Sequence, residues 1–159
     1  MRRALLLCLL LAACQNYDVT VNDRQVYGPV RPFNDFEVAD PALQRCLSQH
    51  IGDQRIGDPL QLRVLNCSSA GIASLEGLGL FAALTQLKFS DNRIRNLVEL
   101  GQLGELEMVW LDDNQVVDPV PLYDLLSLNS LDLSGNAKLQ CPAQAADRKS
   151  TRLNSSHRT

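Results

Sequence analysis

Residues 84–105 read LTQLKFSDNRIRNLVELGQLGE, and residues 106–127 continue with LEMVWLDDNQVVDPVPLYDLLS in the same phase. The 22-residue phase extends to residues 62–83 before them and to 128–139 after them. A period of this length indicates a solenoid, in which each unit stacks on the next and buries a face that it cannot bury alone. The columns kept in phase are Leu62, Leu84, Leu106 and Leu128; Leu65, Leu87, Val109 and Leu131; Cys67, Phe89, Leu111 and Leu133; and Ile72, Ile94 and Val116.

Each unit predicts a short strand, a turn and a short helical segment. Alternating apolar residues such as Leu87 and Phe89 point to one face of a strand, and the strands of successive units can stack into a parallel sheet. Apolar residues at three-residue spacing after the turn suit a 3-10 or helical segment. Turn formers at residues 112–114 and 134–136 exclude one continuous leucine-rich helix.

The repeat, written LxxLxLxxNxIxxLxxLxxLxx, resembles the 22-residue, internalin-like class of leucine-rich repeats over residues 62–139, about half of the chain. The resemblance implies an α/β fold: a right-handed leucine-rich-repeat solenoid with a parallel concave sheet, short helical or 3-10 convex segments, and about four units in residues 62–141. Asp118 and Pro119 depart from the pattern in the third unit, and residues 137–138 depart from it in the fourth. Pro119 fits the convex side, where no sheet amide is needed.

A polar column stands beside the apolar ones at Asn92, Asn114 and Asn136. An inward asparagine can satisfy backbone groups in adjacent turns, and a buried polar group must be satisfied. We therefore expect a structural asparagine ladder rather than a binding site.

Residues 36–61 are expected to form a helical N-terminal cap, because a repeat stack exposes an apolar end unless something covers it. Asp40 is a favourable N-cap residue, and Pro41 is a favourable first helical residue. The residues that then recur at helical spacing are Leu43, Cys46, Leu47 and His50.

Cys46 lies on the helix face that should meet the first repeat, where Cys67 takes the inward strand position. We therefore predict a disulfide between Cys46 and Cys67, in a pattern similar to the N-terminal caps of bacterial leucine-rich-repeat lipoproteins and internalins. It would add about 3 kcal/mol by the chain-entropy estimate. The alternative is a pair of buried free thiols. Cys141 would then be a free thiol or pair with a cysteine in a missing segment.

The N-terminus predicts an export signal. Two arginines at residues 2–3 precede an apolar run at residues 4–13, and polar sequence follows Cys14. The run is about half the roughly 20 apolar residues that a membrane-spanning helix needs, so we expect no permanent transmembrane anchor.

The sequence LAAC at residues 11–14 resembles the lipobox of bacterial lipoproteins. This implies that residues 1–13 are removed, that Cys14 carries the lipid, and that the protein reaches the cell envelope. Gln15, in place of Asp, implies transfer to the outer membrane by the sorting rule of that class. The alternative is an ordinary cleavage site with a chance cysteine. We expect residues 14–35 to be a lipidated tether, although a strand near residues 17–27 is equally open.

Residues 147–157 read DRKSTRLNSSH and resemble the conceptual translation of a common short-read sequencing adapter. This implies that residues 142–159 are a truncated end and that the genuine reading frame stops near Ala146. The alternative is a natural basic tail.

Without the signal peptide and this tail, residues 15–146 hold 9 basic and 17 acidic residues, a net charge of −8. A strongly acidic domain repels phosphate groups, so we expect no nucleic-acid partner.

No motif in the sequence predicts catalysis, a metal site or a cofactor. His50 is the only histidine outside the suspected tail, and we expect it to pack or to face solvent rather than act as a base. Asp91, Asp112 and Asp113 could attract a cation, but acidic residues beside asparagine are also typical of turns. Residues 77–79 lack the third glycine of a dinucleotide-binding loop.

The candidate binding surface is the outward side of the predicted sheet, which we call the concave face. It comprises Val64, Asn66, Ser68, Gln86, Lys88, Ser90, Met108, Trp110, Asp112, Ser130, Asp132 and Ser134. An outward Trp110 beside Met108 has the composition of an interface hot spot. The alternative is lateral packing of Trp110 against its neighbours without any ligand. The residues expected to bind are Gln86, Lys88, Met108, Trp110, Asp112 and Asp132.

We therefore expect a membrane-anchored, extracytoplasmic binding module for a protein or another surface ligand, and not an enzyme. One alternative is a structural envelope lipoprotein whose repeats serve assembly or spacing. Another is the accessory repeat domain of a larger, truncated enzyme. A fold by itself does not decide among the three.

Overall fold

The computed structural model describes residues 19–22, 24–27 and 32–140, and the chain divides into two compact units, Met1–Arg31 and Pro32–Thr159. The predicted signal peptide, the lipidation at Cys14, Cys141 and the adapter-like tail lie outside these described residues. No helix in the described part of the chain is long and apolar enough to cross a membrane.

The first unit contains a small antiparallel hairpin. Strand β1 (Val19–Val21) pairs with β2 (Arg24–Tyr27), with a register shift between Val19 and Thr20. Asn22 in the turn has a φ of 51°, a left-handed conformation that asparagine tolerates. The sequence left open whether this segment is a tether or a strand, and the structure has two strands here.

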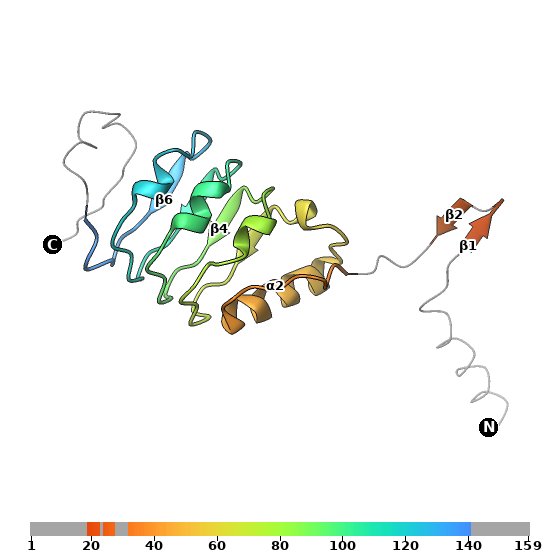
Figure 1. The fold of residues 1–159 in the computed structure, drawn as a ribbon, viewed down its shortest axis with the longest axis horizontal. Coiled ribbons are helices and arrows are strands. Elements are labelled where there is room, and N and C mark those ends of the chain that lie inside the picture. The colour runs from red at the N-terminus through yellow and green to blue at the C-terminus, as the bar shows by residue number, and fades with distance from the viewer. Residues whose placement is uncertain (1–18, 23, 28–31, 141–159) are drawn as a thin grey trace, which may run out of the picture. The chain divides into compact units, whose positions relative to one another are not determined.

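The second unit is a solenoid built on a four-stranded parallel sheet. Its strands are β3 (Val64–Asn66), β4 (Gln86–Lys88), β5 (Met108–Trp110) and β6 (Ser130–Asp132). They lie side by side in sequence order (Figure 1), and equivalent residues of successive repeats pair directly. The predicted parallel sheet is confirmed.

Short 3-10 helices return the chain on the side opposite the strands, as predicted. They are η2 (Pro59–Gln61), η3 (Leu78–Leu80), η4 (Val98–Gln102) and η5 (Val120–Leu122). Pro119, which departs from the repeat pattern, is buried directly before η5. Its fixed φ suits the start of a helical turn, so the departure costs no sheet hydrogen bond.

Two glycines allow these 3-10 helices to stack closely. A Cβ atom on Gly79 would lie 2.9 Å from Oε1 of Gln102, and one on Gly101 would lie 2.9 Å from the carbonyl oxygen of Pro121. The Gly101 contact is with backbone, which cannot move aside, so this position requires glycine.

The inward columns form one continuous core along the sheet. The fully buried members include Leu62, Leu65, Leu84, Leu87, Phe89, Leu106, Val109 and Leu111. In the fourth repeat the equivalent Leu128, Leu131 and Leu133 are only half-buried. The core is therefore fully buried from the first to the third repeat and looser in the fourth.

Helix α2 (Pro41–Gln54) covers the opposite end of the stack, beside the first repeat (Figure 1). Leu43, Leu47 and Ile51 on its inner face are fully buried. The segment before the helix also packs on the first repeat, because the ring of Phe36 meets Phe81 edge-on at 5.4 Å between centroids. The predicted capping helix is thus present.

A disulfide joins α2 to the first strand. Cys46 on the helix is bonded to Cys67, with 6.0 Å between their Cα atoms, and Cys67 is 2% exposed. A covalent cross-link therefore lies at the contact between the cap and the repeats.

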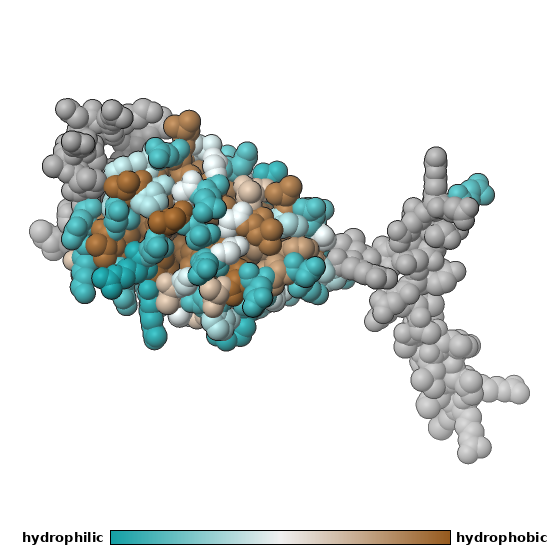
Figure 2. Space-filling view, viewed as in Figure 1, coloured by the Kyte–Doolittle hydropathy of each residue, from teal (hydrophilic) through white to brown (hydrophobic). Residues whose placement is uncertain are grey.

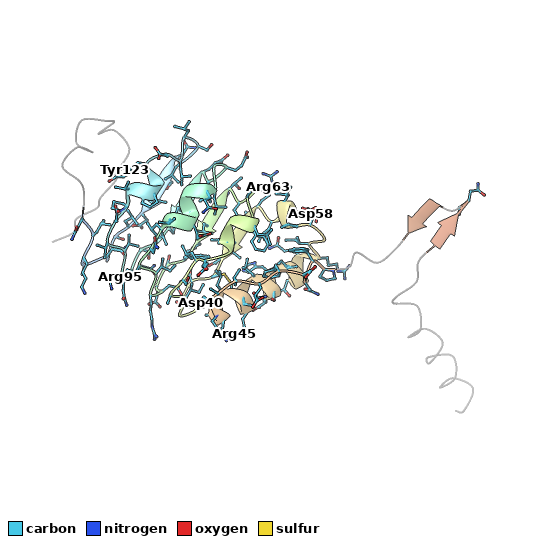
Figure 3. The ribbon with its side chains drawn as sticks, in the orientation of Figure 1. Asp40, Arg45, Asp58, Arg63, Arg95 and Tyr123 are labelled. Atoms are coloured by element: carbon cyan, nitrogen blue, oxygen red, sulfur yellow. A yellow bond between two sulfur atoms is a disulfide. The ribbon has the colours of Figure 1, made fainter. Side chains whose placement is uncertain are left out.

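Asp40 makes a second, non-covalent link between the cap and the first repeat (Figure 3). Its Oδ1 atom accepts from the backbone N–H groups of Ala42 (2.7 Å) and Leu43 (3.2 Å), which caps α2. Its Oδ2 atom accepts from the N–H groups of Ala73 (2.7 Å) and Ser74 (3.1 Å) in the first repeat. Burial acts to raise the pKa of the Asp40 carboxyl, but these four hydrogen bonds outweigh it and lower the pKa below its ordinary value.

We expect Asp40→Asn to lower the free energy of unfolding at pH 7 by about 2 kcal/mol, because one amide oxygen cannot serve both pairs of donors. A lowered folded-state pKa contributes stability that is complete above the unfolded value of about 3.9 and is lost as the pH falls through the folded value. The difference between the native chain and the variant should therefore shrink below about pH 4. Urea titrations at a series of pH values measure this difference.

Asp58→Asn is the matched control, since Asp58 is exposed and its carboxylate accepts from the single N–H of Leu60 at the start of η2. Its effect should stay below about 1 kcal/mol. Equal losses in the two variants would contradict the linking role of Asp40.

Candidate functional site

The concave face consists of two rows of outward side chains, and each strand contributes one residue to each row. Val64, Gln86, Met108 and Ser130 form the first row, and Asn66, Lys88, Trp110 and Asp132 form the second. Neighbouring strands lie about 4.8 Å apart, so adjacent side chains in a row are close enough to contact one another. The structure therefore brings Lys88, Trp110 and Asp132 together in one row, as the repeat predicted.

The exposure of the side chains alternates along strands β3, β4 and β5 of the sheet. Val109 is fully buried, whereas its neighbours Met108 and Trp110 are half-buried and present their outer surfaces. Lys88 is exposed, and Asp132 is half-buried. The centre of the concave face is thus apolar, with a cation on one side and an anion on the other.

Polar residues at the strand ends are held in place by hydrogen bonds. The hydroxyl of Ser90 donates to Oδ1 of Asp112 at 2.6 Å, across two adjacent repeats. Oδ1 of Asp132 accepts from the backbone N–H of Ser134 at 2.9 Å. Side chains that are already fixed lose little conformational entropy when a partner binds.

The asparagine ladder is structural, as expected. Asn114, which is 7% exposed, accepts from the N–H of Ile94 (3.0 Å) in the preceding repeat through Oδ1. Its Nδ2 atom donates to the carbonyl oxygens of Phe89 (2.9 Å), Leu111 (3.2 Å) and Asp112 (3.1 Å). Asn92 and Asn136 make the equivalent bonds, so each repeat is fastened to the one before it.

A further column has left-handed backbone, which the sequence analysis did not identify. Ser69, Asp91 and Asp113 each have a φ of 54°, and Gly135 in the same column has a φ of 73°. Small polar residues and glycine are the types that accept this conformation. Their recurrence at the 22-residue period was the feature of the sequence that could have predicted the left-handed turns.

The acidic residues near this column are engaged in turn structure. Asp91 accepts from the hydroxyl of Ser69 at 2.9 Å, and the carboxylate of Asp113 lies against Gly135. Among the described residues, no group of three histidine, cysteine or acidic side chains is placed to hold a metal ion. The hydrogen bonds and the left-handed turns therefore explain why aspartate occurs at these positions.

His50 lies on α2 and meets the backbone of Asn66, the first residue of the row that contains Trp110. Its Nε2 atom is 2.8 Å from the carbonyl oxygen of Asn66, and because a carbonyl only accepts, Nε2 donates this bond. Nδ1 lies 3.3 Å from Nε2 of Gln54. His50 thus satisfies a carbonyl of strand β3, a packing role that agrees with the expectation.

The side of the molecule seen in Figure 2 carries brown apolar patches separated by teal polar residues. Exposed apolar residues of the 3-10 helices include Leu80 (45%), Val98 (55%) and Val120 (45%). Singly exposed aliphatic residues are common on protein surfaces. They therefore define no second site.

Comparison with known proteins identifies the type of repeat. No protein-family profile matches the sequence. Leucine-rich repeat-containing protein 56 from Rattus norvegicus is 38% identical over 79 residues, which are 48% of this chain and 14% of the rat protein.

Two solved structures from Listeria monocytogenes share the fold. An internalin matches with a TM-score of 0.50 and 19% identity over 70% of this chain and 41% of that chain. Internalin C2 matches with a TM-score of 0.57 and 22% identity over 69% and 55%, respectively. This chain therefore spans less than two thirds of each of these proteins, and its second unit has the fold of a leucine-rich-repeat solenoid.

Proposed function

We propose that this chain is a non-catalytic binding module, anchored in a bacterial cell envelope, whose concave face binds another protein. The observation that carries the proposal is the position of Trp110. It is the only tryptophan of the chain, and it stands half-buried in the sheet between Lys88 and Asp132.

The residue types on this face favour binding over catalysis. Tryptophan and methionine together offer a large apolar contact area, and tryptophan is enriched among the residues that dominate binding free energy. Gln86, Asp112 and Asp132 add polar groups around this apolar centre. The proposal requires no cofactor and no metal ion.

The anchor that we propose is the lipid on Cys14, which follows from the lipobox-like sequence at residues 11–14. Each buried methylene of an acyl chain contributes about 0.8 kcal/mol, and stable anchoring takes more than one chain or an added basic patch. Gln15 supports the outer membrane as the destination. The Cys14→Ser variant should accordingly appear in the soluble fraction of disrupted cells and should incorporate no labelled palmitate.

We expect the variant Trp110→Ala to bind the protein partner at least 30-fold more weakly, because loss of a hot-spot tryptophan costs about 2 kcal/mol or more. The partner is first identified by cross-linking on intact cells. Titration calorimetry with the native chain and the variant then gives the two dissociation constants.

Val98→Ala serves as the control, because Val98 is 55% exposed on η4 and lies off the concave face. It should leave the dissociation constant within about twofold of the native value, since surface contacts outside an interface contribute little. An unchanged affinity of Trp110→Ala for the identified partner would contradict the proposed function.

A further inference from the structure

The charge of the solenoid is divided unevenly between its two halves. Residues 62–104 hold four basic and three acidic residues. Residues 105–140 hold seven acidic residues and one basic residue, Lys138. The acidic residues of this second stretch are Glu105, Glu107, Asp112, Asp113, Asp118, Asp124 and Asp132. Trp110 therefore lies in the acidic half.

Two of these acidic residues, Asp112 and Asp132, also lie near Trp110 on the concave face. Asp132 stands beside Trp110 in the paired register of β5 and β6, and Asp112 follows Trp110 by two residues on the same side. The only ion pair between described side chains is Arg63 with Glu105, at 3.9 Å. Within the described residues, then, no cation neutralises Asp112 or Asp132.

From this arrangement we propose that the protein bound by the concave face presents an arginine-bearing segment, whose guanidinium groups lie against Trp110 and pair with Asp112 and Asp132. The proposal rests on the function proposed above and names the chemistry of its partner. An arginine side chain stacks on the face of an aromatic ring and binds carboxylates through two parallel hydrogen bonds. Lysine can do neither as well, because its ammonium group is compact and strongly hydrated.

Charge complementarity supports this partner over a neutral or an acidic one. Residues 32–140 hold 15 acidic and 7 basic residues, so the domain as a whole attracts cations and repels anions. Bringing an acidic segment to Asp112 and Asp132 would place like charges together at close range, which disfavours that class of partner.

The test uses the full chain and synthetic peptides as probes. Three eight-residue peptides alternate alanine with arginine, with lysine or with glutamate, and each carries a fluorescent label for anisotropy. Fluorescence of Trp110 gives an independent signal from the concave face, since the chain has no other tryptophan. We expect the arginine peptide to bind and to change this fluorescence, the lysine peptide to bind at least threefold more weakly, and the glutamate peptide not to bind.

Two double variants separate local pairing from general attraction. Asp112→Asn/Asp132→Asn removes two charges from the concave face, and Asp118→Asn/Asp124→Asn removes two charges beside η5 in the same half of the solenoid. The first pair should weaken binding of the arginine peptide at least tenfold, and the second less than threefold. Equal weakening by both pairs, no binding of the arginine peptide, or equal binding of the glutamate peptide would overturn the inference.

The same variants distinguish failure of this inference from failure of the proposed function. If Trp110→Ala weakens binding of the identified partner and Asp112→Asn/Asp132→Asn does not, the concave face binds its partner and only the arginine chemistry is wrong. If neither variant affects the identified partner, both proposals fail.

Discussion

Asn114→Ala should lower the free energy of unfolding by about 3–4 kcal/mol, the largest effect of any single polar substitution that we expect in this protein. The substitution leaves the buried backbone N–H of Ile94 without its acceptor and removes one of the two donors to each of three carbonyl oxygens. These carbonyls still accept from Asn92, Asn136 and the N–H of Asp91. The unpaired N–H costs about 1–3 kcal/mol, each of the three lost hydrogen bonds adds about 0.5 kcal/mol, and a water molecule entering the gap recovers part of the loss. Thermal unfolding followed by circular dichroism measures the loss.

A second substitution distinguishes hydrogen bonding from the loss of volume. Asn114→Asp keeps the size of the side chain but turns a carboxylate toward three carbonyl oxygens, so it should destabilise at least as much as Asn114→Ala. The control is Asn96→Ala, because Asn96 is exposed and accepts only from the N–H of Val98. A full-stability Asn114→Asp variant would show that the ladder is not what holds the repeats together.

Removal of the disulfide by Cys46→Ala/Cys67→Ala should cost about 3 kcal/mol. The cross-link closes a loop with a sequence separation of 21, and the chain-entropy estimate for a loop of that size gives this value. The bond also joins α2 to the first repeat, so its loss leaves the cap held by packing and by the hydrogen bonds to Asp40. Guanidinium titration of the exported protein measures the change in stability.

Reductant provides the matched control for this prediction. It should destabilise the native chain by about the same 3 kcal/mol and leave Cys46→Ala/Cys67→Ala unchanged. Alkylation of the unfolded, unreduced protein followed by peptide mapping reports the bond directly. Alkylated Cys46 and Cys67 in protein exported to an oxidising compartment would mean that the two residues are buried free thiols.

The repeats were predictable because their columns are fixed by the same physics in every unit. An inward leucine such as Leu87 recurs every 22 residues, and this one period accounts for the buried columns of the repeats. The capping helix was predictable because Asp40 and Pro41 are local signals for a helix start. The outward row containing Trp110 followed from the alternation of a strand.

Other features depend on contacts that no local pattern contains. Asp40 binds the N–H groups of Ala73 and Ser74, residues that are 33 and 34 positions away, so only the folded arrangement shows its second role. His50 likewise meets the carbonyl of Asn66 across 16 positions. The hairpin at residues 19–27 was left open because short alternating segments are typical both of strands and of extended tethers.

The fastening of one end of the solenoid gives its unfolding a direction. Near α2, a covalent bond and two hydrogen bonds to Asp40 hold the first repeat, whereas the leucines at 131 and 133, in and just after β6, are only half-buried. In a linear array each unit is stabilised mainly by its neighbours, so local opening costs the least free energy where the core is least buried. Among the described repeats, the fourth should therefore open most often and the first least often, and amide hydrogen exchange should be slowest next to α2.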